Sequence, residues 1–274
     1  MLLPILGLFG FVVYRAIYPK VEKAPLGVRR LAAALEKPRV VPAVTESGGE
    51  PPHSEKSAGS IVLIMDDFGF DGQPIERAMT LDPDINFAIL PNGTRAADFA
   101  DRLNDHGFEI LVHLPMEPLG SASPGHNAIL TSMPDEEIAR LVRENVRAVP
   151  HARGMNNHMG SRATADRRVM STVLNALPRG MYFVDSRTIE KSVAEKVARE
   201  LNVRTAARHV FLDDVRTPAA VRQQLETLVA LARERGVAVG IGHPHQVTLD
   251  VLAAEVPRLR ERGFRFLRAS AIVD

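Results

Sequence analysis

From Ser60 onward, short apolar runs of strand length alternate with longer amphipathic segments about seven times along the chain. The first run, SIVLIM, is apolar at every position after its serine, as expected of a strand that is buried on both faces. The same type of run recurs as INFAIL, FEILVHL, MYFVD, HVFLD, VAVGIG and FRFLRA. This alternation predicts an α/β domain with parallel strands, arranged either as an open doubly wound sheet or as a closed barrel.

Two of the segments between the runs carry helix signals. In DEEIARLVRENVRAV, apolar residues return every three or four positions, and Ser132 with Asp135 is expected to form a capping box. In TPAAVRQQLETLVALARERG, Thr217 suits the N-cap, Pro218 the first helical position and Gly236 the position after the helix. No Gly-x-Gly-x-x-Gly follows the first strand, so nothing specific supports a dinucleotide-binding fold.

The chain opens with an apolar run, MLLPILGLFGFVV, which YRAIY extends around Arg15. The run is short for a membrane span of about 20 residues and lacks the basic start of a good signal peptide. Three interpretations stay open: a signal anchor, which we favour, a cleaved signal peptide that starts upstream, and a buried or interfacial helix. Arg15, Lys20 and Lys23 would favour a cytoplasmic location for that flank, which conflicts with an exported domain.

Residues 38–59 contain four prolines and three glycines and show no periodicity, so they are typical of a linker. We therefore divide the chain into a signal anchor or signal peptide at 1–23, a flexible linker at 24–59 and one folded domain at 60–274.

Composition limits the kinds of partner that the protein could bind and the residue types that could hold a metal ion. The net charge is +1, only 5% of the residues are aromatic and tryptophan is absent, which argues against a nucleic-acid partner. There is no cysteine, so any metal ion must be held by His, Asp, Glu or Asn.

Polar residues follow the apolar runs at their carboxyl ends. Six runs end in an acid or an imidazole: Asp66-Asp67, His113, His158, Asp185, Asp213-Asp214 and His243. In barrels and open α/β sheets this edge is where active sites are built. Each residue also has an ordinary structural interpretation, such as an N-cap, a turn or a half-buried histidine; for Asp213 or Asp214 the N-cap is about as probable as a site role.

A divalent cation explains the six residues together. Burying Asp66 and Asp67 side by side is costly unless a cation or hydrogen-bond donors neutralise them. A metal bound by one carboxylate and two imidazoles leaves a position for water, and the second carboxylate is free to act as a base. In GMNNHMGSR, His158 is a candidate ligand, and Asn156 and Asn157 are expected to orient it or to donate to substrate oxygen. Gly154 and Gly160 are expected to let the backbone pass close to a ligand.

Six motifs in order, IMDDFG, VHLPMEP, GMNNHMGS, FVDSRT, RHVFLD and IGHPH, resemble the divergent polysaccharide deacetylase family over about residues 60–274. This family is related to the carbohydrate esterases that remove N-acetyl or O-acetyl groups from glycans. The resemblance implies a distorted seven-stranded β/α barrel, a divalent metal that is usually zinc, and a location in the bacterial cell envelope, often with an N-terminal membrane anchor. Residues 60–274 would then be the catalytic domain.

The resemblance also implies roles for individual residues. The first aspartate of the pair is the base and the second binds metal, which corresponds to Asp66 and Asp67. The next motif supplies two histidines in the spacing His-x-x-x-His, but here His113 is followed by Glu117. The third ligand is therefore Glu117 or a residue from elsewhere, and we favour His158.

The late motif of the family corresponds to Ile241-Gly242-His243, which makes His243 the acid. The remaining candidates for substrate contact or for support of the ligands are Asn156, Asn157, Glu117, Asp185, Asp213 and His245.

Three functions are compatible with these residues. The first is a metal-dependent deacetylase whose substrate is an acetylated glycan of the envelope. The second is a non-catalytic envelope protein that binds glycan or a partner through a relic metal site. The third is another metal hydrolase, for instance of phosphate esters, because Arg162, Arg187 and Arg208 lie near the motifs.

Overall fold

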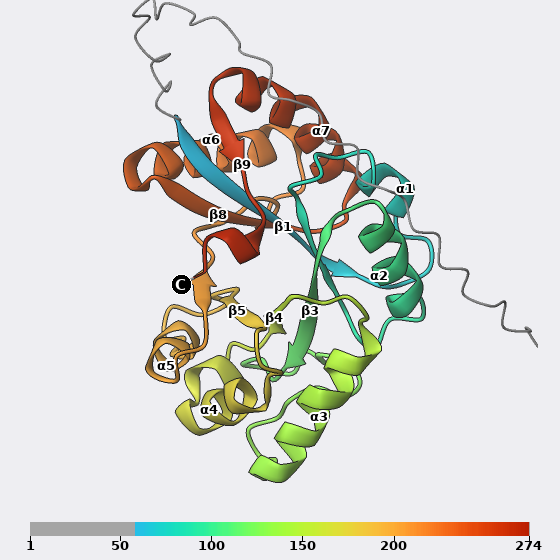
Figure 1. Ribbon diagram of the computed structural model, residues 1–274, viewed down its shortest axis with the longest axis vertical. Helices are drawn as coiled ribbons and strands as arrows, with labels where there is room; N and C mark the ends of the chain where they lie inside the picture. Colours follow the sequence, from blue (N-terminus) through green and yellow to red (C-terminus); the bar gives the residue numbers. More distant parts are fainter. Residues whose placement is uncertain (1–57, 274) are drawn as a thin grey trace, which may run out of the picture. The chain divides into compact units, whose positions relative to one another are not determined.

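Nine strands form a single sheet in which all neighbouring strands are parallel, within residues 58–273, the part of the chain that the computed structural model describes. The strands lie inside and the helices surround them (Figure 1). The strands are β1 (Gly59–Phe68), β2 (Asn86–Ile89), β3 (Glu109–Met116), β4 (Gly154–Met159), β5 (Tyr182–Asp185), β6 (Thr205–Ala207), β7 (Val210–Phe211), β8 (Val237–Gly242) and β9 (Phe264–Phe266). The helices are α1 (Ile75–Ala78), α2 (Ala96–Asp105), α3 (Asp135–Ala148), α4 (Arg167–Ala176), α5 (Ala194–Glu200), α6 (Pro218–Arg235) and α7 (Gln246–Glu261), with short 3₁₀ turns η2 (Ala163–Ala165) and η3 (Ala269–Ala271).

The segment that contains β6 and β7 closes the sheet. The strand order is β6-β5-β4-β3-β2-β1-β8-β7, so the two edge strands are consecutive in the chain. Between them, Arg208 N donates to Asp185 O (2.9 Å) on the β5 side, and His209 N donates to Val239 O (2.9 Å) on the β8 side. The prediction of a distorted β/α barrel of the polysaccharide deacetylase type is thus confirmed, and the open doubly wound alternative is wrong.

The sheet has nine strands instead of the expected seven, for two reasons. β6 and β7 are two pieces of one irregular segment, and β9 pairs only with Gly59–Ile61 at the start of β1.

Side chains of each central strand alternate between two hydrophobic cores, as a period of two requires. In β1, Ile61, Leu63 and Met65 pack in the large core shared with the helices. Val62 and Ile64 point the other way, into a smaller core with residues of β3, β5 and β8. All five are fully buried, which is why this run is continuously apolar instead of alternating.

The two helix signals have different outcomes. α6 begins and ends as predicted: Thr217 Oγ1 accepts from Ala220 N (3.3 Å), and Gly236 terminates the helix with φ 83°. The capping box of α3 is wrong, because Pro134 is the N-cap and no side chain caps the first turn. Asp135 already lies within that turn, where its negative charge faces the positive end of the helix dipole.

The predicted signal anchor and almost all of the predicted linker fall outside the described residues. Within 58–273, no helix combines the length and apolar character needed to cross a membrane.

Gly154 has a different role from the expected one. It opens β4 and pairs with Tyr182, and a Cβ on it would lie 2.3 Å from two carbons of the Tyr182 ring. The absent side chain therefore makes room for a core tyrosine and not for a ligand. Gly160, with φ 88°, packs against Met116 and Thr164.

We expect Gly154→Ala to lower the free energy of unfolding by about 1–3 kcal/mol, the usual cost of overpacking a filled core. Urea unfolding measures it. The cost should shrink in a Tyr182→Leu background, because the ring that the new Cβ meets is then missing. An equal cost in both backgrounds would show that the ring is not the obstacle.

Candidate metal centre

Asp66 and Asp67 reach one site because β1 is irregular at its carboxyl end. Adjacent side chains of a regular strand point to opposite faces. β1 ends at Phe68, and just before that end its register against β2 shifts between Met65 and Phe68, and Asp67 adopts a left-handed φ of 62°. Both carboxylates then face His113 Nε2, with Asp66 Oδ2 at 3.6 Å and Asp67 Oδ1 at 3.2 Å.

The structure brings Asp67, His113 and His158 together as a group with the spacing that a metal ion requires. His158 Nδ1 lies 2.9 Å from Asp67 Oδ1 and 3.3 Å from His113 Nε2. The parallel register of β3 and β4 supports this approach, because His158 pairs with Pro115, two residues beyond His113.

Asn156 fixes which nitrogen of His113 carries the proton. Its Nδ2 donates to Asp66 Oδ1 (2.8 Å), so its Oδ1 is left as the acceptor 2.8 Å from His113 Nδ1. A neutral His113 is therefore protonated on Nδ1 and presents the lone pair of Nε2 to Asp67 and His158. Asn156 was expected either to orient His158 or to donate to substrate oxygen; in the structure it orients His113 and Asp66.

A cation fits the centre of this group. Asp67 Oδ1 is buried and receives no hydrogen bond of acceptable geometry, although two ring nitrogens lie close to it. A carboxylate oxygen and imidazole lone pairs that point at one another repel unless a proton or a metal ion lies between them. One carboxylate and two imidazoles are a ligand set that divalent metals accept in proteins.

The two neighbouring carboxyl groups differ electrostatically. Burial raises the pKa of Asp66, and the charges of His113 and His243 offset this only in part. Burial also acts to raise the pKa of Asp67, but the close ring nitrogens of His113 and His158 outweigh it and hold that pKa far below its ordinary value. Asp67 is thus the stable anion of the pair, and Asp66 is the stronger base.

His243 lies on the opposite side of the two aspartates from His113 and His158. Met65 of β1 pairs with Gly242 of β8, so Asp66 and His243 are the next residues in register. His243 Nδ1 lies 2.8 Å from Asp213 Oδ1, and its Nε2 lies 4.0 Å from Asp67 Oδ2. Burial lowers the pKa of His243, but Asp213 and Asp66 raise it to about 9 in total.

Asp213 is held on both carboxylate oxygens. Besides the contact with the His243 ring, its Oδ2 accepts from His243 N (2.7 Å) and from Thr248 Oγ1 (2.8 Å). The N-cap interpretation of Asp213 is wrong, because Thr217 caps the following helix.

A stack against His243 was missed by the sequence analysis. The Phe211 ring lies parallel to the imidazole, at 5.9 Å and 21°, and the Arg208 guanidinium lies 3.7 Å from the centre of the Phe211 ring. Arg208 also donates to Ser186 O (2.6 Å) and Arg187 O (2.7 Å). One signal was present, since Phe211 and Asp213 are two residues apart in an extended run and so share a face.

Glu117 does not join the candidate ligands. Its Oε2 accepts from Thr131 N (2.6 Å) and Thr131 Oγ1 (2.7 Å), and its Oε1 pairs with Arg162 Nε (3.2 Å). The position where the family pattern has a second histidine thus anchors a loop, and the third member of the group comes from β4.

Asn157 and Asp185 fix the backbone around the centre instead of entering it. Asn157 Oδ1 accepts from Ser186 N (2.9 Å), which ties β4 to the end of β5. Asp185 accepts from Arg187 N (2.8 Å) and Ser192 Oγ (2.7 Å), so it shapes the turn after β5, as its ordinary interpretation held.

His245 forms a second group of potential ligands with Asp213 and His243. A metal ion there would have to displace the contacts that already engage both oxygens of Asp213. The Asp67 group, with its oxygen that lacks a donor, is the better candidate.

The fold and the site define a β/α-barrel protein with a candidate metal centre at the carboxyl edge of its strands. A family model described as divergent polysaccharide deacetylase matches residues 63–273, so the chain belongs to that family.

Similar proteins agree with this assignment. The chain is 37% identical over 218 residues to uncharacterized protein YibQ of Escherichia coli (strain K12), which covers 79% of this chain and 68% of that protein. It is 36% identical over 202 residues to an uncharacterized protein of Haemophilus influenzae, covering 73% of this chain and 72% of that one. The crystal structure of uncharacterized protein ATU2773 from Agrobacterium tumefaciens C58 shares the fold, with a TM-score of 0.77 and 21% identity over 81% of this chain and 92% of that chain.

We expect His158→Ala to weaken binding of Zn²⁺ by more than about tenfold without unfolding the domain, because one of three ligands is lost. Isothermal titration with Zn²⁺ and circular dichroism measure the two effects. His106→Ala is the matched control, since His106 is exposed and its ring lies 2.8 Å from Arg102 O of its own helix. Unchanged affinity in His158→Ala would exclude His158 as a ligand.

In the metal-free protein, NMR titration of His243 should give a pKa of about 9, above its ordinary 6.5. The stability that protonated His243 contributes is then complete below about pH 6.5 and is lost as the pH rises through about 9. Asp213→Asn should lower this pKa, because it removes the hydrogen-bonded anion. Asp214→Asn, at the exposed neighbour, should leave it unchanged, and equal shifts in both variants would rule out the specific pair.

Proposed function

We propose that the protein is a metal-dependent deacetylase that removes acetyl groups from an acetylated polysaccharide or amino sugar of the cell envelope. One observation carries the proposal: a group of candidate ligands is accompanied by a buried carboxylate outside that group, Asp66, and by an imidazole that Asp213 supports, His243. Such a hydrolysis needs a cation, a base and an acid around one carbonyl. Membership of the divergent polysaccharide deacetylase family supports the same chemistry.

Asp67, His113 and His158 would hold the metal ion, most simply Zn²⁺, since the set combines imidazole and carboxylate and the chain has no thiol. The ion supplies Lewis acidity toward the acetyl carbonyl and makes water more acidic. Elemental analysis of protein purified without added metal tests its identity.

Asp66 is the proposed base. The residue is 2% exposed, and its carboxylate accepts a hydrogen bond from Asn156, which fixes its orientation. The raised pKa makes it a better proton acceptor than an ordinary aspartate, and it would take the proton from the attacking water.

His243 is the proposed acid. It carries a proton at neutral pH because Asp213 stabilises the imidazolium, and it would protonate the leaving amine or alkoxide. Water thus adds to the carbonyl carbon, the bond from that carbon to nitrogen or oxygen breaks, and the products are acetate and the free amine or alcohol.

Two arginines that motivated the phosphate-ester alternative are engaged elsewhere. Arg162 pairs with Glu117, and Arg208 covers Phe211 while donating to two backbone carbonyls. These contacts favour the deacetylase over a phosphate clamp.

We expect Asp66→Asn to keep the metal ion and to lose about 10²–10⁴-fold in turnover, because only the proton acceptor is removed. Asp67→Asn should lose both metal and turnover. Metal analysis and acetate release from acetylated chito-oligosaccharides and peptidoglycan fragments measure the two effects.

Asp71→Asn is the control, since it removes the same charge from an exposed residue that pairs with Arg95. Metal loss in Asp66→Asn together with metal retention in Asp67→Asn would reverse the two roles. A wild-type protein that binds metal but releases no acetate from any glycan tried would favour a glycan-binding protein with a relic site.

We also propose that the domain acts outside the cytoplasm, in the bacterial cell envelope, with the N-terminal segment as its membrane anchor. The apolar run at the start of the sequence and the substrate class support this location. A fusion of residues 1–59 to alkaline phosphatase should be active and membrane-bound. An inactive fusion in the cytosol would contradict the proposal.

A further inference from the structure

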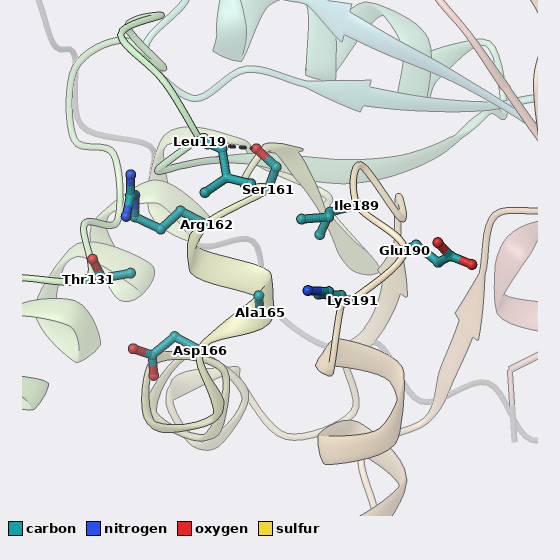
Figure 2. Close-up of a pocket in the computed structure, with 9 residues that line it drawn as sticks. All are labelled: Leu119, Thr131, Ser161, Arg162, Ala165, Asp166, Ile189, Glu190 and Lys191. Atoms are coloured by element: carbon teal, nitrogen blue, oxygen red, sulfur yellow. Dashed lines mark hydrogen bonds between the residues drawn. The ribbon is translucent and has the colours of Figure 1, made fainter.

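A cavity of about 630 Å³ lies at the same edge of the barrel as the candidate metal centre (Figure 2). Its walls are the connections that follow β3, β4 and β5. His113 and His158 lie on the first two of these strands, so the cavity opens on the side of the centre away from His243 on β8. The mechanism proposed above uses none of its lining residues.

The walls of the cavity are fixed to one another by hydrogen bonds. Glu117 O accepts from Arg162 N (3.0 Å), which joins the connection after β3 to the connection after β4. Thr188 Oγ1 donates to Met159 O (2.9 Å), and Val193 N donates to Thr164 O (2.8 Å), which joins the connection after β5. Because three connections are tied together, the cavity is formed before any ligand arrives.

The lining is suited to a sugar ring with a negative substituent. Leu119, Ala165 and Ile189 give apolar surface, and Leu119 is 54% exposed. Ser161 Oγ accepts from Leu119 N (2.7 Å) and keeps its own proton for a ligand. Figure 2 shows the Lys191 side chain extending into the cavity.

Lys191 is the cation of the cavity that is free for a ligand. Within residues 58–273 it forms no ion pair, and the neighbouring Glu190 points away from the cavity in Figure 2. Asp166 is engaged as the N-cap of α4, where it accepts from Val169 N (3.1 Å). Arg162, on the other side, is held by Glu117.

From this geometry we infer that the cavity binds a carboxylate-bearing sugar next to the acetylated one, with Lys191 pairing with the carboxylate. The inference rests on the proposed function for the acetylated sugar and adds the substrate class, an acidic glycan of at least two residues. A neutral sugar would leave the ammonium of Lys191 without a partner, whereas a carboxylate gives a charge-assisted hydrogen bond.

The test compares two β-1,4-linked, N-acetylated disaccharides, N-acetylglucosaminyl-N-acetylmuramic acid and N,N′-diacetylchitobiose. They differ in one lactyl ether, which carries the carboxylate. Calorimetric titration of the full chain, with and without Zn²⁺, should show about tenfold tighter binding of the acidic disaccharide, as expected for one partly screened charge-assisted bond. The preference should shrink when salt is raised from about 0.05 to 0.5 M.

Lys191→Gln should abolish the preference, and Lys196→Gln should retain it. The second variant removes the same charge from an exposed residue on α5 that does not line the cavity. Equal affinity of the wild type for both disaccharides, or equal losses in the two variants, would overturn the inference.

Acetate release separates this inference from the proposed function. Retained preference in binding without acetate from either sugar would contradict the deacetylase and leave the acidic subsite standing. Acetate release at equal efficiency from both sugars, with equal affinities, would support the deacetylase and overturn the subsite.

Discussion

The site depends on the conformation of a single residue, Asp67, at the bulged end of β1. A regular strand would send Asp66 and Asp67 to opposite faces, one into the apolar core and one into the site. The left-handed φ of Asp67 and the shifted register against β2 bring both carboxylates to the same edge. A non-glycine residue in this conformation is strained, and such strain persists only where the surroundings enforce it. The contacts of Asp67 with His113 and His158 are consistent with that requirement.

Hydrogen bonds with Asn156 and Asp213 then give the neighbouring titratable groups different properties. Asn156 spans Asp66 and His113, so one amide both orients a carboxylate and selects the tautomer of an imidazole. Asp213 does the equivalent for His243 from the other side of the barrel. The result is a set of titratable groups within one edge whose pKa values are displaced in different directions, a pattern typical of catalytic sites.

Much of the fold was predictable because a strand that is buried on both faces is apolar at nearly every position. Runs such as SIVLIM and VAVGIG are typical of strands inside a parallel sheet, and their carboxyl ends mark one edge. This reasoning placed Asp67, His113, His158 and His243 at a common site. It left open whether Glu117 and Asp185 serve the site or the local structure, because the length and path of the loops decide whether a carboxylate turns inward or holds a turn. The predicted capping box of α3 was wrong for the same reason, because the path of the loop after β3 determines the residue at which the helix starts.

At Glu117, where the family pattern has a second histidine, the group of candidate ligands takes its third member from the neighbouring strand β4. β3 and β4 are parallel neighbours, and His158 pairs with Pro115, which lies between His113 and Glu117 in the chain. At that register, His158 Nδ1 lies 3.3 Å from His113 Nε2. Glu117 instead binds Thr131 and Arg162. These contacts fix the loop that forms one wall of the cavity in Figure 2. The Glu117 carboxylate therefore supports a wall of the cavity and is not a member of the candidate metal group.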